Sequence, residues 1–253
     1  MIKYNDDGTT TMSYITTGGK IDVYFFLGGS AKDIIRRYQN LVGLPTLVPF
    51  WALGWHQASY GYKTKDQVDE MVQGYATAGI PLEGVWLDNH YMDKFKDFSV
   101  DATAFPDLVA YTTGLQAKGI KVAVNIDAGL SADDPEDTYY KQAQESKTLI
   151  QTGIEENKGK FNGALSSSTY PKNSVFLDFL ADDSTLVWHN GLDDLFQKIP
   201  YDGVVLNMNE ASAFCNGECP DGKPEPQSTL KEGKFLIDIN NSLDTGMWYQ
   251  TYP

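Results

Sequence analysis

The sequence has little positive charge and few histidines and cysteines. Its 253 residues hold 20 Lys and Arg against 34 Asp and Glu, a formal net charge of −14, and the only arginines are Arg36 and Arg37. This balance excludes nucleic acid and anionic membranes as expected partners. The histidines His56, His90 and His189 are scattered and the two cysteines lie far from them. No metal and no other cofactor is therefore predicted.

Long apolar runs and an export signal are also missing. No stretch approaches the ~20 apolar residues of a membrane helix, so no membrane span is predicted. The start, Met1 to Thr11, is polar and acidic, and it lacks the features of a signal peptide. With 42% hydrophobic residues the composition is that of a globular protein with a sizeable core.

Aromatic residues are plentiful, at 13% of the chain. Aromatic faces together with carboxylate acceptors suit a neutral sugar, although large cores use aromatics as well. The two cysteines, Cys215 and Cys219, flank an Asn-Gly turn, which predicts a local disulfide. The glycosylation sequon at Asn240 agrees with a secretory context.

Hydrophobic patterns divide the chain into three parts. Residues 1–29 alternate as strands, at 11–15 and 21–27, and predict the end of an N-terminal β-sandwich domain. Residues 30–45 predict a connecting helix capped by Ser30. Residues 46–253 predict the first half of a (β/α)8 TIM barrel, because apolar strands alternate with helices.

The expected barrel elements follow one another in order. Strands are predicted at 50–55, 84–87, 121–126 and 203–206, with helices at 64–78, 107–118 and 186–198. Residues 131–183 are too long for a plain loop and predict an insertion over the active face. Four strands leave two open edges, so the missing remainder of the barrel is an expected partner.

The residues after the last strand resemble a known catalytic signature. The run from Gly203 to Phe214 contains Asn207-Met208-Asn209-Glu210, which is similar to the W-x-D-M-N-E-x-S-x-F nucleophile pattern of glycoside hydrolase family 31, the α-glucosidase family. The segment from Trp86 to Met92 resembles the family's W-x-D-x-D-Y-M pattern. Matches at 54–62, 97–98 and 125–131, and at the Cys215 and Cys219 pair, extend the resemblance over nearly the whole chain.

This resemblance implies a retaining α-glucosidase domain for terminal α-linked glucose. In such enzymes a carboxylate attacks the anomeric carbon and a second carboxylic acid protonates the leaving oxygen. Here Asn207 occupies the nucleophile position, and the family's acid/base residue belongs to later strands. We therefore expect this chain to be inactive by itself. The resemblance also implies a location in the secretory pathway, either vacuolar, lysosomal or extracellular.

The candidate site residues lie in the nucleophile-like motif or at the carboxyl ends of the predicted strands. Catalytic candidates are Asn207 and Glu210, and substrate-binding candidates are Trp86, Asp88, Asp127, Tyr170 and Met208, which we expect to converge at the carboxyl ends of the strands.

Each of these positions also has a structural interpretation. Trp86 could fill the core, Asp127 could cap a helix, and Glu210 could bond to backbone donors. For the whole chain, a non-catalytic carbohydrate-binding relative and a structural remnant remain alternatives to the α-glucosidase. An α-glucoside or oligosaccharide is the expected ligand.

Overall fold

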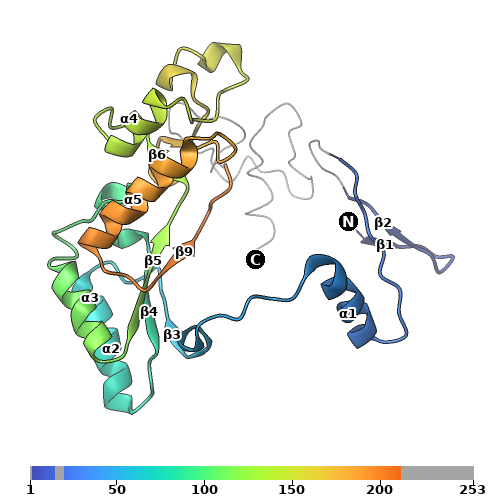
Figure 1. Cartoon of the computed structure of the whole chain (residues 1–253), viewed down its shortest axis with the longest axis horizontal. Helices are drawn as coiled ribbons and strands as arrows, with labels where there is room; N and C mark the ends of the chain where they lie inside the picture. Colours follow the sequence, from blue (N-terminus) through green and yellow to red (C-terminus); the bar gives the residue numbers. More distant parts are fainter. Residues whose placement is uncertain (1, 15–19, 212–253) are drawn as a thin grey trace. The chain divides into compact units, whose positions relative to one another are not determined.

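The computed structural model describes residues 2–14 and 20–211 of the chain (Figure 1). It forms two compact units, which divide between Val48 and Pro49. In the described part of the chain no helix combines the length and the apolar character needed to cross a membrane.

The first unit contains one hairpin and one helix. Strand β1 (Ile2–Tyr4) pairs antiparallel with β2 (Thr10–Met12). Helix α1 (Ala31–Val42) begins at Ser30, whose side chain accepts from the Asp33 backbone N–H as expected. The predicted strand at 21–27 is wrong, because none of the described residues pairs with that segment and it has no regular structure. Whether residues 1–29 end a β-sandwich domain stays a prediction.

The second unit is built on a four-stranded parallel sheet with the order β3-β4-β5-β9. Its strands are β3 (His56–Gln57), β4 (Gly84–Leu87), β5 (Lys121–Ile126) and β9 (Gly203–Leu206). Neighbouring strands lie in parallel register, with Trp86 beside Ala123 and Asn125 beside Val205. The last three strands lie where the apolar runs predict them.

The first predicted strand is misplaced. Residues Phe50–Leu53 form the 3-10 helix η1, and the paired strand begins only at His56. Phe50 is 90% exposed, so the apolar run is not a buried strand in this structure. An apolar run alone cannot fix where pairing starts, because pairing depends on the neighbouring strand.

Three helices connect the strands, and Figure 1 shows α2 and α3 beside the sheet. They are α2 (Lys65–Ala78), α3 (Leu108–Ala117) and α5 (Ser184–Lys198). Thr64 caps α2 by accepting from the Gln67 backbone N–H, as predicted. Val68 and Val72 of α2 are buried as expected, whereas Ala76 is exposed.

The predicted insertion is a folded subdomain. It contains β6 (Gly129–Ser131), β7 (Ser166–Ser167) and β8 (Ser174–Phe176), which form an antiparallel sheet in the order β6-β8-β7. Helix α4 (Thr138–Glu145) packs against α5, and Asp137 caps its start. The insertion also contains the short 3-10 helices η4 (Glu155–Asn157) and η5 (Phe161–Gly163). Two more 3-10 helices, η2 (Asn89–Tyr91) and η3 (Asp93–Phe95), follow β4.

The two faces of the parallel sheet differ in their side chains. Val85, Leu87, Val122, Val124 and Ile126 belong to the hydrophobic core with residues of the three connecting helices. Side chains alternate between faces along a strand, so Trp86, Ala123, Asn125 and Val205 share the other face. Trp86 and Asn125 thus give that face aromatic and polar side chains, which the core-facing side of the sheet lacks.

Candidate active site

A hollow of about 250 Å³ opens at the carboxyl ends of the strands. It is lined by Ala58, Trp86, Leu87, Asp88, Asn125, Val205 and Asn207. Parallel strands deliver the residues that follow them to one edge, which explains why Asp88 after β4 and Asn207 after β9 meet here. The expected juxtaposition of Asp88 with Asn207 is therefore present.

Asp127 lies in a network of amides next to this hollow. Its Oδ1 accepts from Asn207 Nδ2 at 3.0 Å and its Oδ2 accepts from Asn89 Nδ2 at 2.5 Å. Asn89 is itself held, because its Oδ1 accepts from Asn125 Nδ2. Burial raises the pKa of Asp127 to about 6, and the two amide hydrogen bonds oppose that rise.

A second carboxyl, Asp97, supports the network from the protein interior. Its Oδ1 accepts the backbone N–H of Asp127 at 3.1 Å, and only 4% of the residue is exposed. Burial, together with the nearby Asp127 charge, raises the pKa of Asp97 well above its ordinary value. Asp97 therefore holds the Asp127 backbone in place through this hydrogen bond.

Asp88 caps the start of the 3-10 helix η2, where one of its carboxylate oxygens accepts the Asn89 backbone N–H at 2.7 Å. That bond orients the carboxylate by local geometry and leaves it in the wall of the hollow. The side chain of Asp88 is half-buried, which makes it the carboxylate of the hollow that a ligand can reach.

Trp86 is positioned by His56. Its Nε1 donates to His56 Nδ1 at 3.0 Å, and His56 Nε2 lies 3.0 Å from the Trp51 carbonyl oxygen. Since Nδ1 accepts, Nε2 carries the proton and donates to Trp51. Trp86 is 37% exposed, so it is not part of the closed core and its ring contributes a wall of the hollow.

The rest of the nucleophile-like motif turns away from the strand. Met208 adopts a left-handed backbone with φ 49°, and Asn209 Nδ2 donates to the carbonyl oxygens of Asn207 and Ile126. Glu210 is exposed and does not line the hollow. A catalytic role for Glu210 stays a prediction, and Cys215 and Cys219 lie outside the described residues.

Tyr170 lies in a cluster of aromatic side chains. Its hydroxyl lies 3.1 Å from that of Tyr60, and its ring centroid lies 5.0 Å from that of Phe95. His90 completes the cluster, with ring centroids 4.4 Å from Tyr60 and 5.5 Å from Phe95. We call Tyr60, His90, Phe95 and Tyr170 the aromatic cluster. Tyr170 does not line the hollow at Asp88 directly.

Sequence reasoning missed three residues of the site. Asn89, Asn125 and Asp97 are buried and bonded to Asp127 or to one another. Asn125 could have been recognised in the sequence, because it is a polar residue inside an otherwise apolar strand. Such a residue needs a partner when it is buried, but which partner it finds depends on the packing of neighbouring strands.

In this arrangement a neutral amide stands at the position where the sequence motif predicts a nucleophile. Asn207 presents an amide whose nitrogen is engaged by Asp127, and an amide is a poor nucleophile. The described residues include no group of three or more His, Cys, Asp or Glu placed to bind a metal ion. Neutral polyol hydroxyls suit Asp88 as an acceptor and Trp86 as an apolar wall.

The fold and the site together define the class of this protein. The model of the glycosyl hydrolases family 31 TIM-barrel domain matches residues 45–251, so the chain belongs to that family of glycoside hydrolases. Its four parallel strands are those of a partial TIM barrel.

Individual relatives agree with this assignment. Over 85% of this chain, the sequence is 33% identical to glucoamylase 1 of Candida albicans. Over 92% of this chain, it is 32% identical to a probable alpha-glucosidase of Oryza sativa subsp. japonica. Over 93% of this chain, it is 31% identical to alpha-xylosidase 1 of Arabidopsis thaliana. These matches cover 23%, 26% and 25% of the relatives, so the chain spans about a quarter of their length.

Solved structures share the fold. The alpha subunit of glucosidase II in its DNJ-bound form matches with a TM-score of 0.62 and 25% identity, over 78% of this chain and 21% of that one. A Flavobacterium johnsoniae dextranase complexed with glucose matches with a TM-score of 0.61 and 22% identity, over 75% of this chain and 22% of that one.

Proposed function

We propose that this chain is an α-glucosidase-type domain that binds terminal α-linked glucose in the hollow beside Asp88, and that Asn207 prevents it from hydrolysing the bond. The observation that carries the proposal is that Asp88 and Asn207 line one hollow at the carboxyl edge of the sheet. Family membership and relatives named glucoamylase and alpha-glucosidase support the choice of glucose.

Binding of the sugar is tested first. Isothermal titration with glucose should give a dissociation constant of about 1 mM or weaker, because a lone monosaccharide makes few contacts in a half-open site. Asp88→Asn should weaken that binding, while the exposed control Asp193→Asn on α5 should leave it unchanged. Xylose lacks the hydroxymethyl group and distinguishes a glucoside site from a xyloside site.

The role of Asn207 is tested with 5-fluoro-α-glucosyl fluoride, whose fluoride leaves without an acid catalyst. The native chain should form no covalent adduct. Asn207→Asp supplies a carboxylate and should form a glycosyl ester, seen by mass spectrometry on the peptide that contains position 207. On a chromogenic α-glucoside the native chain should show no turnover above the uncatalysed rate.

A second candidate is a non-catalytic carbohydrate-binding protein. It is favoured by the engagement of both Asp127 oxygens by amides, which leaves no free carboxylate beside Asn207 in that network. This candidate predicts glucose binding without any ester in Asn207→Asp. A purely structural role predicts no sugar binding at all. We further propose a secretory location, for which glycosylation at Asn240 in a eukaryotic host is the test.

A further inference from the structure

A second hollow lies within the insertion itself. Its volume is about 320 Å³, which is the size of a pocket for a small organic ligand. Its lining comes from α4, from the segment that follows α4 and from the 3-10 helix η5. None of its lining residues belongs to the hollow at Asp88. We call it the insertion pocket.

One part of the lining of the insertion pocket is apolar. Ala143 is fully buried, Leu149 is 5% exposed, and Phe161 packs against the hydrophobic core of this unit. An aromatic ring and two aliphatic side chains favour a ligand with an apolar body, because binding there removes apolar surface from water.

The polar part of the lining offers one ammonium group, three carboxamides and no carboxylate, from Lys147, Gln144, Gln151 and Asn162. Lys147 is exposed, and its side chain makes no ion pair among the residues that the structure describes. Gln144 Nε2 is buried and has no hydrogen-bond partner in that part of the chain. Donors that lack an acceptor favour an anionic head group, because an anion accepts hydrogen bonds and pairs with the ammonium charge.

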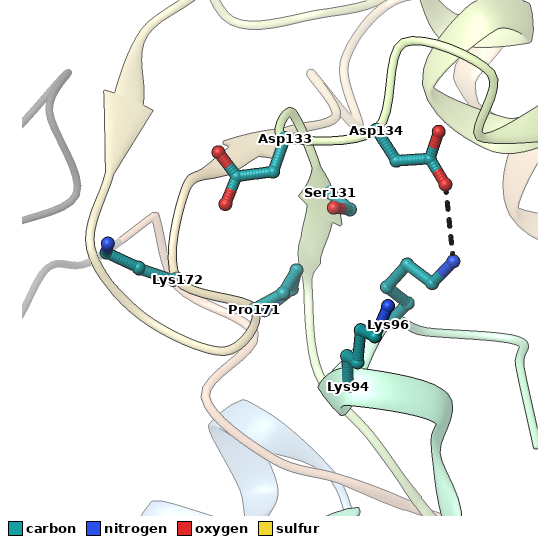
Figure 2. Close-up of a pocket in the computed structure, with 7 residues that line it drawn as sticks. All are labelled: Lys94, Lys96, Ser131, Asp133, Asp134, Pro171 and Lys172. Atoms are coloured by element: carbon teal, nitrogen blue, oxygen red, sulfur yellow. Dashed lines mark hydrogen bonds and ion pairs between the residues drawn. The ribbon is translucent and has the colours of Figure 1, made fainter. Parts of the chain in front are cut away.

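A larger hollow of about 370 Å³ differs from the insertion pocket in its charges (Figure 2). There Lys96 Nζ lies 3.3 Å from an Asp134 carboxylate oxygen, and Asp133 belongs to the same lining. An anion in that hollow would face two carboxylates. The lining of the insertion pocket carries charge of one sign only, so an anion meets no like charge among the lining residues.

Three residues of the insertion pocket have a left-handed backbone. The angle φ is 58° at Lys147, 45° at Phe161 and 55° at Asn162. This conformation costs a residue other than glycine about 1 kcal/mol or more, and it persists only where the surrounding structure holds it. Lys147 also occupies the position after α4 at which glycine is usual. The fold thus keeps a cation, an aromatic ring and an amide around one pocket against their backbone preference.

We propose that the insertion pocket binds a small carboxylate with an apolar body, of the arylalkanoate kind. Lys147 pairs with the carboxylate, and the apolar body lies against Leu149 and Phe161. This inference goes beyond the proposed function and does not depend on it, because the two hollows share no lining residue.

The test uses 3-phenylpropionate as the probe and 3-phenylpropanamide as its neutral counterpart, in titrations followed by the amide NMR signals of the whole chain. The carboxylate should bind about tenfold more tightly than the amide, since one charge-assisted hydrogen bond is of that order. The shifted signals should belong to residues 143–163. Added sodium chloride should reduce the difference between the two probes, because salt screens the charge of an exposed lysine.

Lys147→Met should lose most of the preference for the carboxylate and bind the amide as the native chain does. Asn162→Asp adds a carboxylate to the lining and should weaken the binding of 3-phenylpropionate alone. Aspartate tolerates a left-handed backbone as asparagine does, so this variant should fold. The control Lys118→Met removes a charge at another exposed position and should change the affinity of neither probe.

Equal affinities for the two probes, or no binding of either, would overturn the inference. Shifts centred on Asp88 and Asn207 would overturn it too, because they would place the probe in the other hollow. The same holds for a preference for the carboxylate that survives both Lys147→Met and Asn162→Asp. None of these outcomes decides whether glucose binds beside Asp88.

Discussion

Asn207 Nδ2 donates to Asp127 Oδ1 over 3.0 Å, so the amide at the nucleophile position is a hydrogen-bond donor to a buried carboxyl. A carboxylate in place of Asn207 would face Asp127 across the same distance as a like charge. The identity of residue 207 therefore controls the protonation of Asp127 as well as the chemistry of the hollow.

Asn207→Asp should raise the pKa of Asp127 beyond its present value of about 6, because the new carboxylate repels its charge and the amide hydrogen bond is lost. The coupled pair should keep one proton at neutral pH. Carbon-13 NMR titration of the carboxyl groups measures this. Asn162→Asp introduces a carboxyl at an exposed position and is the control, which should titrate as an ordinary aspartate. The prediction would be contradicted if the carboxyl introduced at position 207 titrated like the one introduced at position 162.

Asp127 should make folding less favourable as the pH rises. Its folded pKa of about 6 lies above the ordinary 3.8, so its contribution is fully present below pH 4 and is lost as the pH passes 6. The difference corresponds to about 3 kcal/mol. Urea unfolding from pH 4 to 7 should show a smaller fall in stability for Asp127→Asn than for the native chain. The exposed control Asp182→Asn should match the native slope.

Asp202 should have the opposite pH dependence. It accepts from Lys121 Nζ at 2.8 Å, from Gln116 Nε2 at 3.0 Å and from the Val122 backbone N–H at 2.9 Å, and these bonds lower its pKa despite burial. Its stabilisation is present above the ordinary pKa and is lost as the pH falls through the lowered value.

Asp202→Ala should therefore lower the free energy of unfolding at pH 7 by about 2 to 4 kcal/mol, since several donors lose their acceptor. Urea unfolding provides the measurement. Asp193→Ala breaks an exposed pair with His189 and should change stability by less than about 0.5 kcal/mol. Equal losses in the two variants would contradict the difference in burial on which this prediction depends.

Two glycines in helices should respond in opposite directions to alanine. A Cβ at Gly191 of α5 would lie 2.5 Å from the buried Phe98 ring, so Gly191→Ala should cost about 1 to 3 kcal/mol. A Cβ at Gly114 of α3 meets nothing within 4 Å, so Gly114→Ala should stabilise by about 0.5 to 1 kcal/mol. Thermal unfolding of both variants measures the change in stability. An increase in stability for Gly191→Ala would contradict the close contact between position 191 and the Phe98 ring.

Cys215 and Cys219 should form a local disulfide in protein made under oxidising conditions, because the Asn-Gly turn between them favours a reversal of the chain. Mass spectrometry of a non-reduced digest measures the bond. Two thiols that both react with an alkylating reagent would disprove it.

The strand predictions show where sequence patterns suffice. The segments at 84–87, 121–126 and 203–206 are short, apolar and bounded by glycine or charge, and each forms a strand with those bounds. The run at 50–55 is apolar as well, yet it forms a 3-10 helix at Phe50–Leu53. Apolar character alone does not distinguish these cases, because a strand exists only where another strand accepts its hydrogen bonds.

The sequence by itself determined the family and the residues that follow each strand, since Trp86, Asp88, Asp127 and Asn207 stand in recognisable motifs. Only the tertiary structure decided which of them meet. It brought Asp88 and Asn207 to one hollow, tied Asp127 to Asn207 and Asn89, left Glu210 exposed, and placed Tyr170 in the aromatic cluster. The reason is physical: a strand fixes the position of the residue that follows it, whereas hydrogen-bond partners depend on the register and packing of segments distant in the chain.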